Sequence, residues 1–216
     1  MDYGMMLSKL SGGMLTTIAI FGLTLLFSMP LGMIVAFGRM SKNAVIRNLT
    51  KIYISVMRGT PLMLQIMVVY FGRYYLFGVR ITSSYRFIAV IIAFALNYAA
   101  YFAEIYRGGI ESMPAGQYEA ANLLGYTKSQ TFFRIILPQV VKRIIPSVTN
   151  EIITLVKDTS LAMAIAVSEM FTIAKALASA STSMIPYVSA GIFYYVFNFV
   201  VAWVMEKIEK KLNYYR

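Results

Sequence analysis

Two acidic residues stand inside long apolar stretches of this chain. Glu104 comes near the end of an apolar run that begins at Phe87, and Asp158 lies within a run that begins at Ile144. If these runs cross a bilayer, each charge costs about 2.5 to 3.5 kcal/mol on insertion scales unless it meets water, a partner or a ligand. The two carboxylates therefore indicate a polar chamber between helices that can hold a cationic group.

Residues at helical spacing from these carboxylates could complete a binding site for a small zwitterion such as an amino acid. Asn97 and Tyr101 share a helical face with Glu104. A zwitterion requires acceptors for its ammonium, donors for its carboxylate and a shaped wall. Two hydroxyl residues that follow the second carboxylate are candidate polar contacts, and Tyr101 and Met163 are candidate walls or plain packing residues. The predicted substrate-binding residues are Asn97, Tyr101, Glu104, Asp158, Thr159, Ser160 and Met163.

A cationic side chain would gain most from two carboxylates, so we predict a preference for basic amino acids. Other interpretations of the same residues stay open. Glu104 can be an interfacial carboxylate that pairs with Arg107, three residues on. Asp158 can neutralise a lysine on another helix, and the Asn97 amide can bond helices together.

The composition is that of an integral membrane protein. Of the 216 residues, 59% are hydrophobic and 13% are charged, which is too apolar for an ordinary soluble domain. The chain has no Cys and no His, which excludes thiolate or imidazole metal sites, disulfides and Ser-His or Cys-His nucleophile pairs. A net charge of +11 is typical of the cytoplasmic flanks of membrane spans, so we expect membrane lipid rather than nucleic acid as a partner.

Apolar segments predict five transmembrane helices in one domain that fills residues 1–216. Most Lys and Arg residues fall on the cytoplasmic side if the N-terminus is outside, and the C-terminus is then cytoplasmic. The loop between the third and fourth spans, about residues 107–143, is cytoplasmic in this orientation. The predicted spans are about residues 12–38, 52–72, 87–106, 144–167 and 185–205.

Two segments depart from a simple span. Arg58-Gly59-Thr60-Pro61 interrupts the second span, because Gly and Pro break the backbone hydrogen-bond ladder. One interpretation is a structural kink, and the other is that residues 44–57 form a separate amphipathic helix lying against the membrane. Residues 175–184 are rich in Ala, Ser and Thr and are predicted to be an outside loop or a short re-entrant segment.

The cytoplasmic loop is predicted to hold a helix, a turn and a second helix. Residues 117–124 have a helix-forming composition, Gly125 can take the left-handed conformation that ends a helix, and Thr127 can cap the next run. Residues 127–137 are amphipathic and too polar to cross a membrane, and we expect Pro138 to bend or end this helix. Such an element could receive the push of a partner, or could be an interfacial loop without one.

The spacing of this loop resembles the EAA motif of the membrane subunits of bacterial ATP-binding-cassette importers. The motif is Glu-Ala-Ala, three residues, Gly, nine residues, Ile, any residue, Leu and Pro, and the chain meets every position from Glu119 to Pro138. Residues 58–61, 103–110 and 157–161 are similar to the polar amino-acid branch of the family, with permeases for arginine, lysine, histidine or glutamine. The resemblance implies a type I importer transmembrane domain whose ATPase-coupling residues are Glu119, Ala120, Ala121, Gly125, Leu137 and Pro138.

The resemblance also implies a set of partners in a bacterial inner membrane. These are a second, identical permease subunit, a cytoplasmic ATPase dimer docked on the loop, and a periplasmic binding protein that delivers the amino acid. By the same resemblance Glu104 stands at a family-typical acidic position and would contact the ammonium common to all substrates, which weakens the argument for a basic side chain.

We expect this chain to bind no cofactor and to be no enzyme, with ATP and Mg held by the partner ATPase. Its nearest match to a phosphate loop ends in Lys128-Ser129, but Thr127 stands where a glycine must precede the lysine. Asn122 likewise occupies the slot of the first glycine. Two rival functions use the same features: an ion-gradient-driven carrier, for which five spans without a visible repeat are a poor basis, and a channel or signalling component of the membrane.

Overall fold

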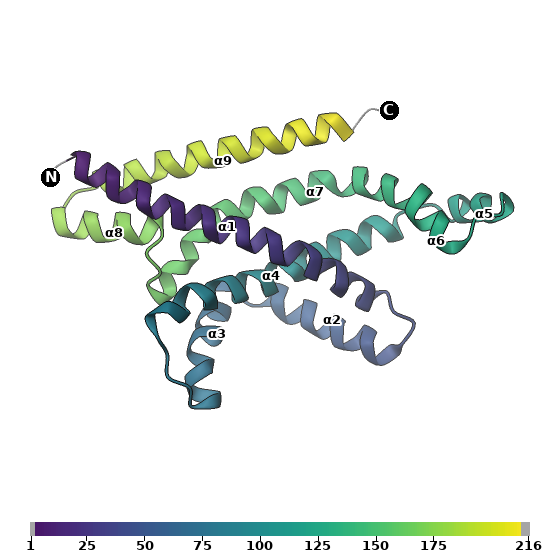
Figure 1. Ribbon diagram of the computed structural model, residues 1–216, viewed down its shortest axis with the longest axis horizontal. Coiled ribbons are helices and arrows are strands. Elements are labelled where there is room, and N and C mark those ends of the chain that lie inside the picture. The colour runs from purple at the N-terminus through teal and green to yellow at the C-terminus, as the bar shows by residue number, and fades with distance from the viewer. Residues whose placement is uncertain (1–2, 213–216) are drawn as a thin grey trace.

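The computed structural model describes residues 3–212, which are helical with short connections. In Figure 1 the long helices α1, α4, α7 and α9 extend along the molecule, α5 and α6 lie at one end, and α8 lies near the N-terminus at the other end. The elements are α1 (Tyr3–Arg39), α2 (Ala44–Gly59), α3 (Leu62–Phe77), α4 (Ser83–Glu111), α5 (Ala115–Leu123), α6 (Lys128–Gln130), the π-helix η1 (Thr131–Ile136), α7 (Leu137–Asp158), the 3-10 helix η2 (Thr159–Ile165), α8 (Met170–Ser181) and α9 (Ile185–Leu212).

The core forms where α1 packs along α4. The buried face of α1 consists mainly of small residues, which allow the two backbones to approach closely. At Gly32 an added Cβ atom would come within 2.8 Å of Phe102 Cβ and 3.1 Å of the Ala99 carbonyl oxygen. Phe94, Tyr98 and Phe102 of α4 are almost fully buried in this core. Helix α4 is therefore the central element against which the others are positioned.

Within residues 3–212, three helices, α1, α4 and α9, are long and apolar enough to cross a membrane, and the number rises to five if each of two bent helix pairs is one span. Predicted spans 12–38, 87–106 and 185–205 fall inside the three unbroken helices. The second predicted span, 52–72, is divided between α2 and α3, whose axes meet at 111°. This angle is far larger than a kink, so the interpretation of a separate amphipathic α2 is the one that the structure supports.

The fourth predicted span, 144–167, also differs from the observed helix. Helix α7 ends at Asp158, η2 continues to Ile165, and α8 follows at an angle of 58°. Ala166, the residue after η2, has a φ of 56°, so the chain turns there before α8 begins. For residues 175–184 the loop alternative was wrong over most of the stretch, because α8 extends to Ser181. The other alternative, a short re-entrant segment, is compatible with the bend before α8.

The loop between α4 and α7 contains the predicted turn. Gly125 has a φ of 78°, and its N–H donates to the Asn122 carbonyl while the Tyr126 N–H donates to the Ala121 carbonyl, which is a Schellman ending of α5. Thr127 then forms a capping box with Gln130 at the start of α6. The two local predictions for Gly125 and Thr127 are confirmed.

The helix does not end at Pro138, so that one of the two predicted outcomes was wrong. The chain stays helical from α6 through η1 into α7, and Pro138 lies in the first turn of α7. The wider π-turn at 131–136 comes just before the proline, where it removes the clash that a proline ring makes with a regular helical turn. The second helix of the loop and the fourth predicted span are therefore one continuous helical rod.

The close approach of α1 and α4 leads to a prediction about stability. Gly32→Val should lower the free energy of unfolding by about 1–3 kcal/mol, because the new side chain overpacks the contact with Phe102. Gly22→Val in the same helix is the control, since a Cβ atom there meets nothing within 4 Å. Thermal unfolding of the purified protein measures both, and equal midpoints would contradict the packing argument.

Candidate functional site

One cavity is lined by polar side chains of α4, of α7 and of the break between α2 and α3. Its volume is about 400 Å³, within the range of about 300–1,000 Å³ typical of small-molecule sites. We call it the polar cavity. Its lining residues are Thr60, Pro61, Leu62, Asn97, Tyr98, Tyr101, Glu151, Thr154, Asp158 and Leu161.

Helix α7 supplies the acidic wall of the polar cavity. Glu151 and Asp158 are seven residues apart, which places both carboxylates on one helical face, and both are half-buried. The Tyr98 hydroxyl of α4 donates a hydrogen bond of 2.7 Å to Asp158 Oδ2. Asp158 is therefore held by a tyrosine rather than by a lysine from another helix, and it lines the cavity.

Asn97 is buried at the edge of the cavity, where it holds the break between α2 and α3. Its amide donates to the Met57 carbonyl oxygen at 2.9 Å and to Gln65 Oε1 at 3.0 Å. Gln65 in turn donates to the Met57 carbonyl and to Thr60 Oγ1. These bonds satisfy backbone groups that the break leaves without helical partners. Asn97 thus makes the interhelical bonds that one of the two sequence interpretations expected.

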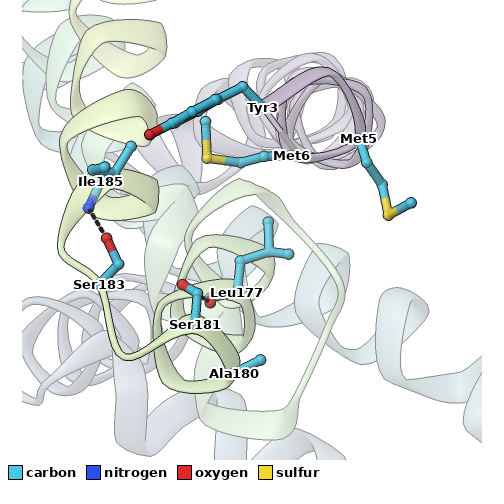
Figure 2. A pocket seen from close by; sticks show the side chains of 8 residues that line it. All are labelled: Tyr3, Met5, Met6, Leu177, Ala180, Ser181, Ser183 and Ile185. Carbon is cyan, nitrogen blue, oxygen red and sulfur yellow. Dashed lines mark hydrogen bonds between the residues drawn. The ribbon is translucent and has the colours of Figure 1, made fainter. Parts of the chain in front are cut away.

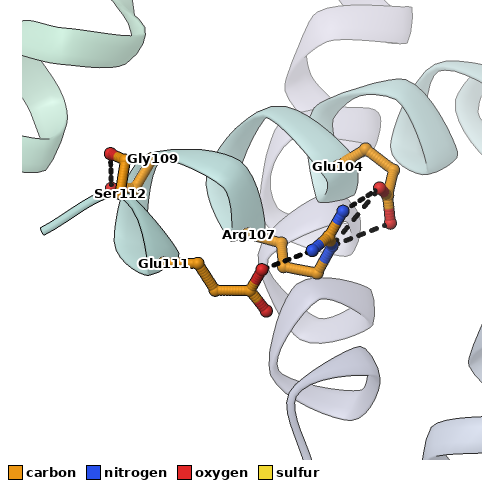
Figure 3. Close-up of polar contacts among 5 residues, drawn as sticks. All are labelled: Glu104, Arg107, Gly109, Glu111 and Ser112. Carbon is orange, nitrogen blue, oxygen red and sulfur yellow. Dashed lines mark hydrogen bonds and ion pairs between the residues drawn. The ribbon is translucent and has the colours of Figure 1, made fainter.

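Glu104 lies outside the polar cavity. It shares a face with Asn97, but seven residues of helix separate the two by about 10 Å along the axis. Its carboxylate pairs with Arg107 at 2.6 Å, and Arg107 also contacts Glu111, so the arginine joins two acidic side chains at the end of α4 (Figure 3). The structure therefore brings Glu104 to Arg107, as the pairing interpretation expected, and not to Asp158.

The three predicted residues after Asp158 also do not line the polar cavity. Thr159 is fully buried and its hydroxyl donates to the Val156 carbonyl at 2.8 Å, while the Ser160 hydroxyl donates to the Lys157 carbonyl at 2.8 Å. The α-helix ends at Asp158, and the tighter 3-10 turn that follows carries Thr159, Ser160 and Met163 off the face of α7. Of the predicted set, Asn97, Tyr101 and Asp158 come together in the cavity.

The structure adds lining residues that the sequence interpretation left out. Glu151 was recognisable, because its spacing from Asp158 is that of one helical face. Tyr98 and Thr60 gave no such signal, since their place depends on how α4 meets the break. No group of three or more acidic, Cys or His side chains able to hold a metal occurs within residues 3–212.

A second hollow lies at the opposite end of the molecule from the loop, between the start of α1 and the end of α8. Its volume is about 580 Å³, and Figure 2 shows Met6 directed from α1 toward the side of Ile185 and Met5 directed away from it. None of its lining residues in the described part of the chain is charged, so it offers nothing to the charges of a zwitterion. The polar cavity is the better candidate for a polar ligand. The lining residues are Tyr3, Met5, Met6, Leu177, Ala180, Ser181, Ser183 and Ile185.

The predicted coupling residues form the outer end of the loop. Glu119 and Ala120 are exposed on α5, Ala121 is buried against η1, and Leu137 and Pro138 lie at the start of α7. The end of α5 also exposes apolar side chains to an unusual degree, with Leu123 at 88% and Leu124 at 75% exposure.

Broken apolar helices around a polar cavity, with an exposed helical loop at one end, define the membrane component of a transporter. Residues 28–214 match the family described as binding-protein-dependent transport system inner membrane component, and the chain belongs to this family. It is 38% identical to the L-cystine transport system permease protein TcyB of Bacillus subtilis (strain 168), over 95% of this chain and 87% of the relative. It is 39% identical to the octopine transport system permease protein OccM of Rhizobium radiobacter, over 85% and 79% of the two chains.

A solved structure described as an amino acid ABC transporter with histidines covers 98% of this chain and 99% of its own, with a TM-score of 0.87 and 29% identity. The MetNI methionine ABC transporter, at 16% identity and a TM-score of 0.75, shares the fold. The chain is therefore the permease subunit of an ABC amino-acid importer, a multi-pass inner-membrane protein with the type I importer fold. A separate ATPase subunit hydrolyses ATP, and the family works with a periplasmic binding protein. The importer prediction is confirmed, in place of the carrier and channel alternatives.

The bonds made by Asn97 lead to a second stability prediction. Asn97→Ala should lower the free energy of unfolding by about 1 kcal/mol or more, because the Met57 carbonyl and the Gln65 side chain each lose a buried partner. Asn150→Ala on the exposed face of α7 is the matched control. An unfolding midpoint for Asn97→Ala equal to that of the control would exclude this role.

Proposed function

We propose that the polar cavity is the substrate site of the importer and that its preferred substrates are amino acids with cationic side chains, such as arginine, lysine and histidine. The observation that carries this proposal is the presence of Glu151 and Asp158 on one wall of a single cavity. Two carboxylates in a partly desolvated site favour a ligand with a second positive charge over one with the ammonium alone. Tyr101 and Leu161 supply the apolar part of the wall.

The cationic preference can be tested by removing the charges of the cavity. Glu151→Gln and Asp158→Asn should each weaken the binding of arginine and lysine at least about tenfold, while glutamine binding changes less, because the amides keep the shape but lose the charge. The measurement is equilibrium binding of radiolabelled arginine, lysine, histidine and glutamine to the purified assembly.

Two further variants make this test selective. Glu206→Gln, at an exposed pair with Lys210 on α9, is the control and should leave all affinities unchanged. Glu104→Gln tests whether the substrate binds near Glu104, at the end of α4, instead of in the polar cavity. A loss of arginine binding in Glu104→Gln, with none in Asp158→Asn, would move the substrate site from the polar cavity to the end of α4.

We also propose that the loop between α4 and α7 couples the ATPase to the cavity. Exposed apolar residues at the end of α5, such as Leu123 and Leu124, are suited to a protein partner rather than to water. Both sides of the turn are capped, at Gly125 and at Thr127, so the loop can move as a rigid body. Closure of the ATPase dimer, which binds ATP and Mg, then tilts α4 and α7 and turns the cavity from one side of the membrane to the other.

The proposed assembly contains two identical permease subunits, each with its N-terminus outside and its C-terminus in the cytoplasm. The distribution of Lys and Arg supports this orientation. In Figure 1 the N-terminus and α5 lie at opposite ends of the molecule, and α9 runs toward the end that holds α5. Both observations are consistent with an ATPase on the side of the C-terminus.

The role of the loop leads to a test at Gly125. Gly125→Val should raise the number of ATP molecules hydrolysed per amino acid imported several-fold, because a branched residue at a φ of 78° strains the turn by at least about 1–2 kcal/mol. Gly78→Val is the matched control, since Gly78 has a φ of 66° at the far end of α3. Full coupling in Gly125→Val would contradict the transmission of force through this turn.

A further inference from the structure

The polar cavity has acceptors for an ammonium group but few free donors for a carboxylate. The hydroxyl groups of the lining residues Thr60 and Thr154 donate to carbonyl oxygens of their own chain segments. Tyr98 donates to Asp158, and the Asn97 amide donates across the break. A zwitterion in this cavity would therefore leave its carboxylate short of donors unless another residue contributes them.

Arg58 is a cation beside the polar cavity. It lies in the last turn of α2, two residues before Thr60, and it is exposed. Its guanidinium carbon is 5.2 Å from the ring centroid of Tyr101, a residue that lines the cavity. Glu151, which lines the same cavity, lies within electrostatic range of Arg58. No carboxylate among residues 3–212 lies within salt-bridge distance of it.

We propose that Arg58 is the carboxylate-binding residue of the polar cavity and that it selects substrates by their α-carboxylate; this inference rests on the proposed function of the cavity. The guanidinium leaves the Tyr101 ring and forms a bidentate pair with the substrate carboxylate. Its planar fork of donors matches the two carboxylate oxygens. The substrate's positive groups face Glu151 and Asp158, so the positive and negative walls of the cavity match the two ends of a zwitterion.

The surrounding charges support a role in binding rather than in neutralising Glu104. The short contacts of Glu104 go to Arg107 at 2.6 Å, so this carboxylate already has a partner. Glu151 makes no hydrogen bond or salt bridge to a side chain in the described part of the chain, and neither does Arg58. A zwitterion that bridges Arg58 and Glu151 would compensate both charges at once, which neither achieves alone at their present separation.

The experiment compares each amino acid with its α-carboxamide, which lacks the negative charge. Binding of arginine and argininamide, and of glutamine and its α-amide, is measured on the purified permease–ATPase complex without the binding protein. The unmodified complex should bind each acid at least about tenfold more tightly than its amide. Arg58→Gln should remove this difference by weakening the acid alone, and Arg58→Lys should retain part of it, because lysine keeps the charge but not the fork.

Arg73→Gln is the matched control. The guanidinium of Arg73 lies over the Tyr85 ring at 4.4 Å, which is the same kind of contact as that of Arg58 with Tyr101. Neither Arg73 nor Tyr85 lines the polar cavity. Arg73→Gln should therefore leave the preference for acid over amide unchanged. The proposal is overturned if Arg58→Gln keeps the preference, or if it weakens acid and amide equally. If Arg58→Gln fails to assemble with the ATPase, an undiminished preference in Arg58→Lys overturns it.

The two proposals can fail separately in this experiment. The preference for arginine over glutamine reports on Glu151 and Asp158, and the preference for acid over amide reports on Arg58. A complex that favours glutamine yet discriminates against both amides would contradict the cationic substrate and support Arg58. Absence of binding of all four ligands to the unmodified complex would contradict the cavity as a binding site and Arg58 with it.

Discussion

Backbone groups that a helix break exposes within a membrane must find partners inside the protein, and this constraint determines the centre of the structure. Asn97 and Gln65 supply the partners at the break between α2 and α3. Because α4 contributes Asn97, the break is tied to the central helix of the core. The same bonds hold Thr60 and Pro61 at the wall of the polar cavity, so the cavity exists where a broken helix meets an intact one.

The second break follows the same rule on the other side of the cavity. Helix α7 ends at Asp158, and α8 begins after a fully buried carboxylate, Glu169. Glu169 accepts hydrogen bonds from the N–H groups of Phe171 and Thr172 and from the Tyr194 hydroxyl. The first two bonds give partners to N–H groups in the first turn of α8. The third connects the start of α8 to α9. Both broken segments are therefore anchored by buried polar side chains, and the cavity lies between the two.

The sequence predicted those features that depend on short stretches of chain. The turn at Gly125 and the cap at Thr127 follow from residues within one turn of them, and α1, α4 and α9 follow from the length of their apolar runs. The distance of Glu104 from the cavity and the displacement of Thr159 and Ser160 could not be predicted in this way. They depend on where α4 meets the break and on a change of helix type after Asp158, and tertiary contacts decide both. The continuity of the helix through Pro138 depends on a π-turn that residue patterns do not reveal.

Two contacts link the loop to the cavity. Near the loop, Gly109 of α4 packs so closely on Ile144 of α7 that no side chain would fit between them. At the cavity, the Tyr98 hydroxyl bonds to Asp158. Helices α4 and α7 are thus in contact both near the loop and at the cavity, and a displacement of the loop moves them together. The break between α2 and α3 is tied to this pair through the Asn97 bonds and the contact of Arg58 with Tyr101, and the adjoining Leu62 and Ile66 are buried in the same apolar cluster as Tyr98. The break and the pair therefore share one packed core.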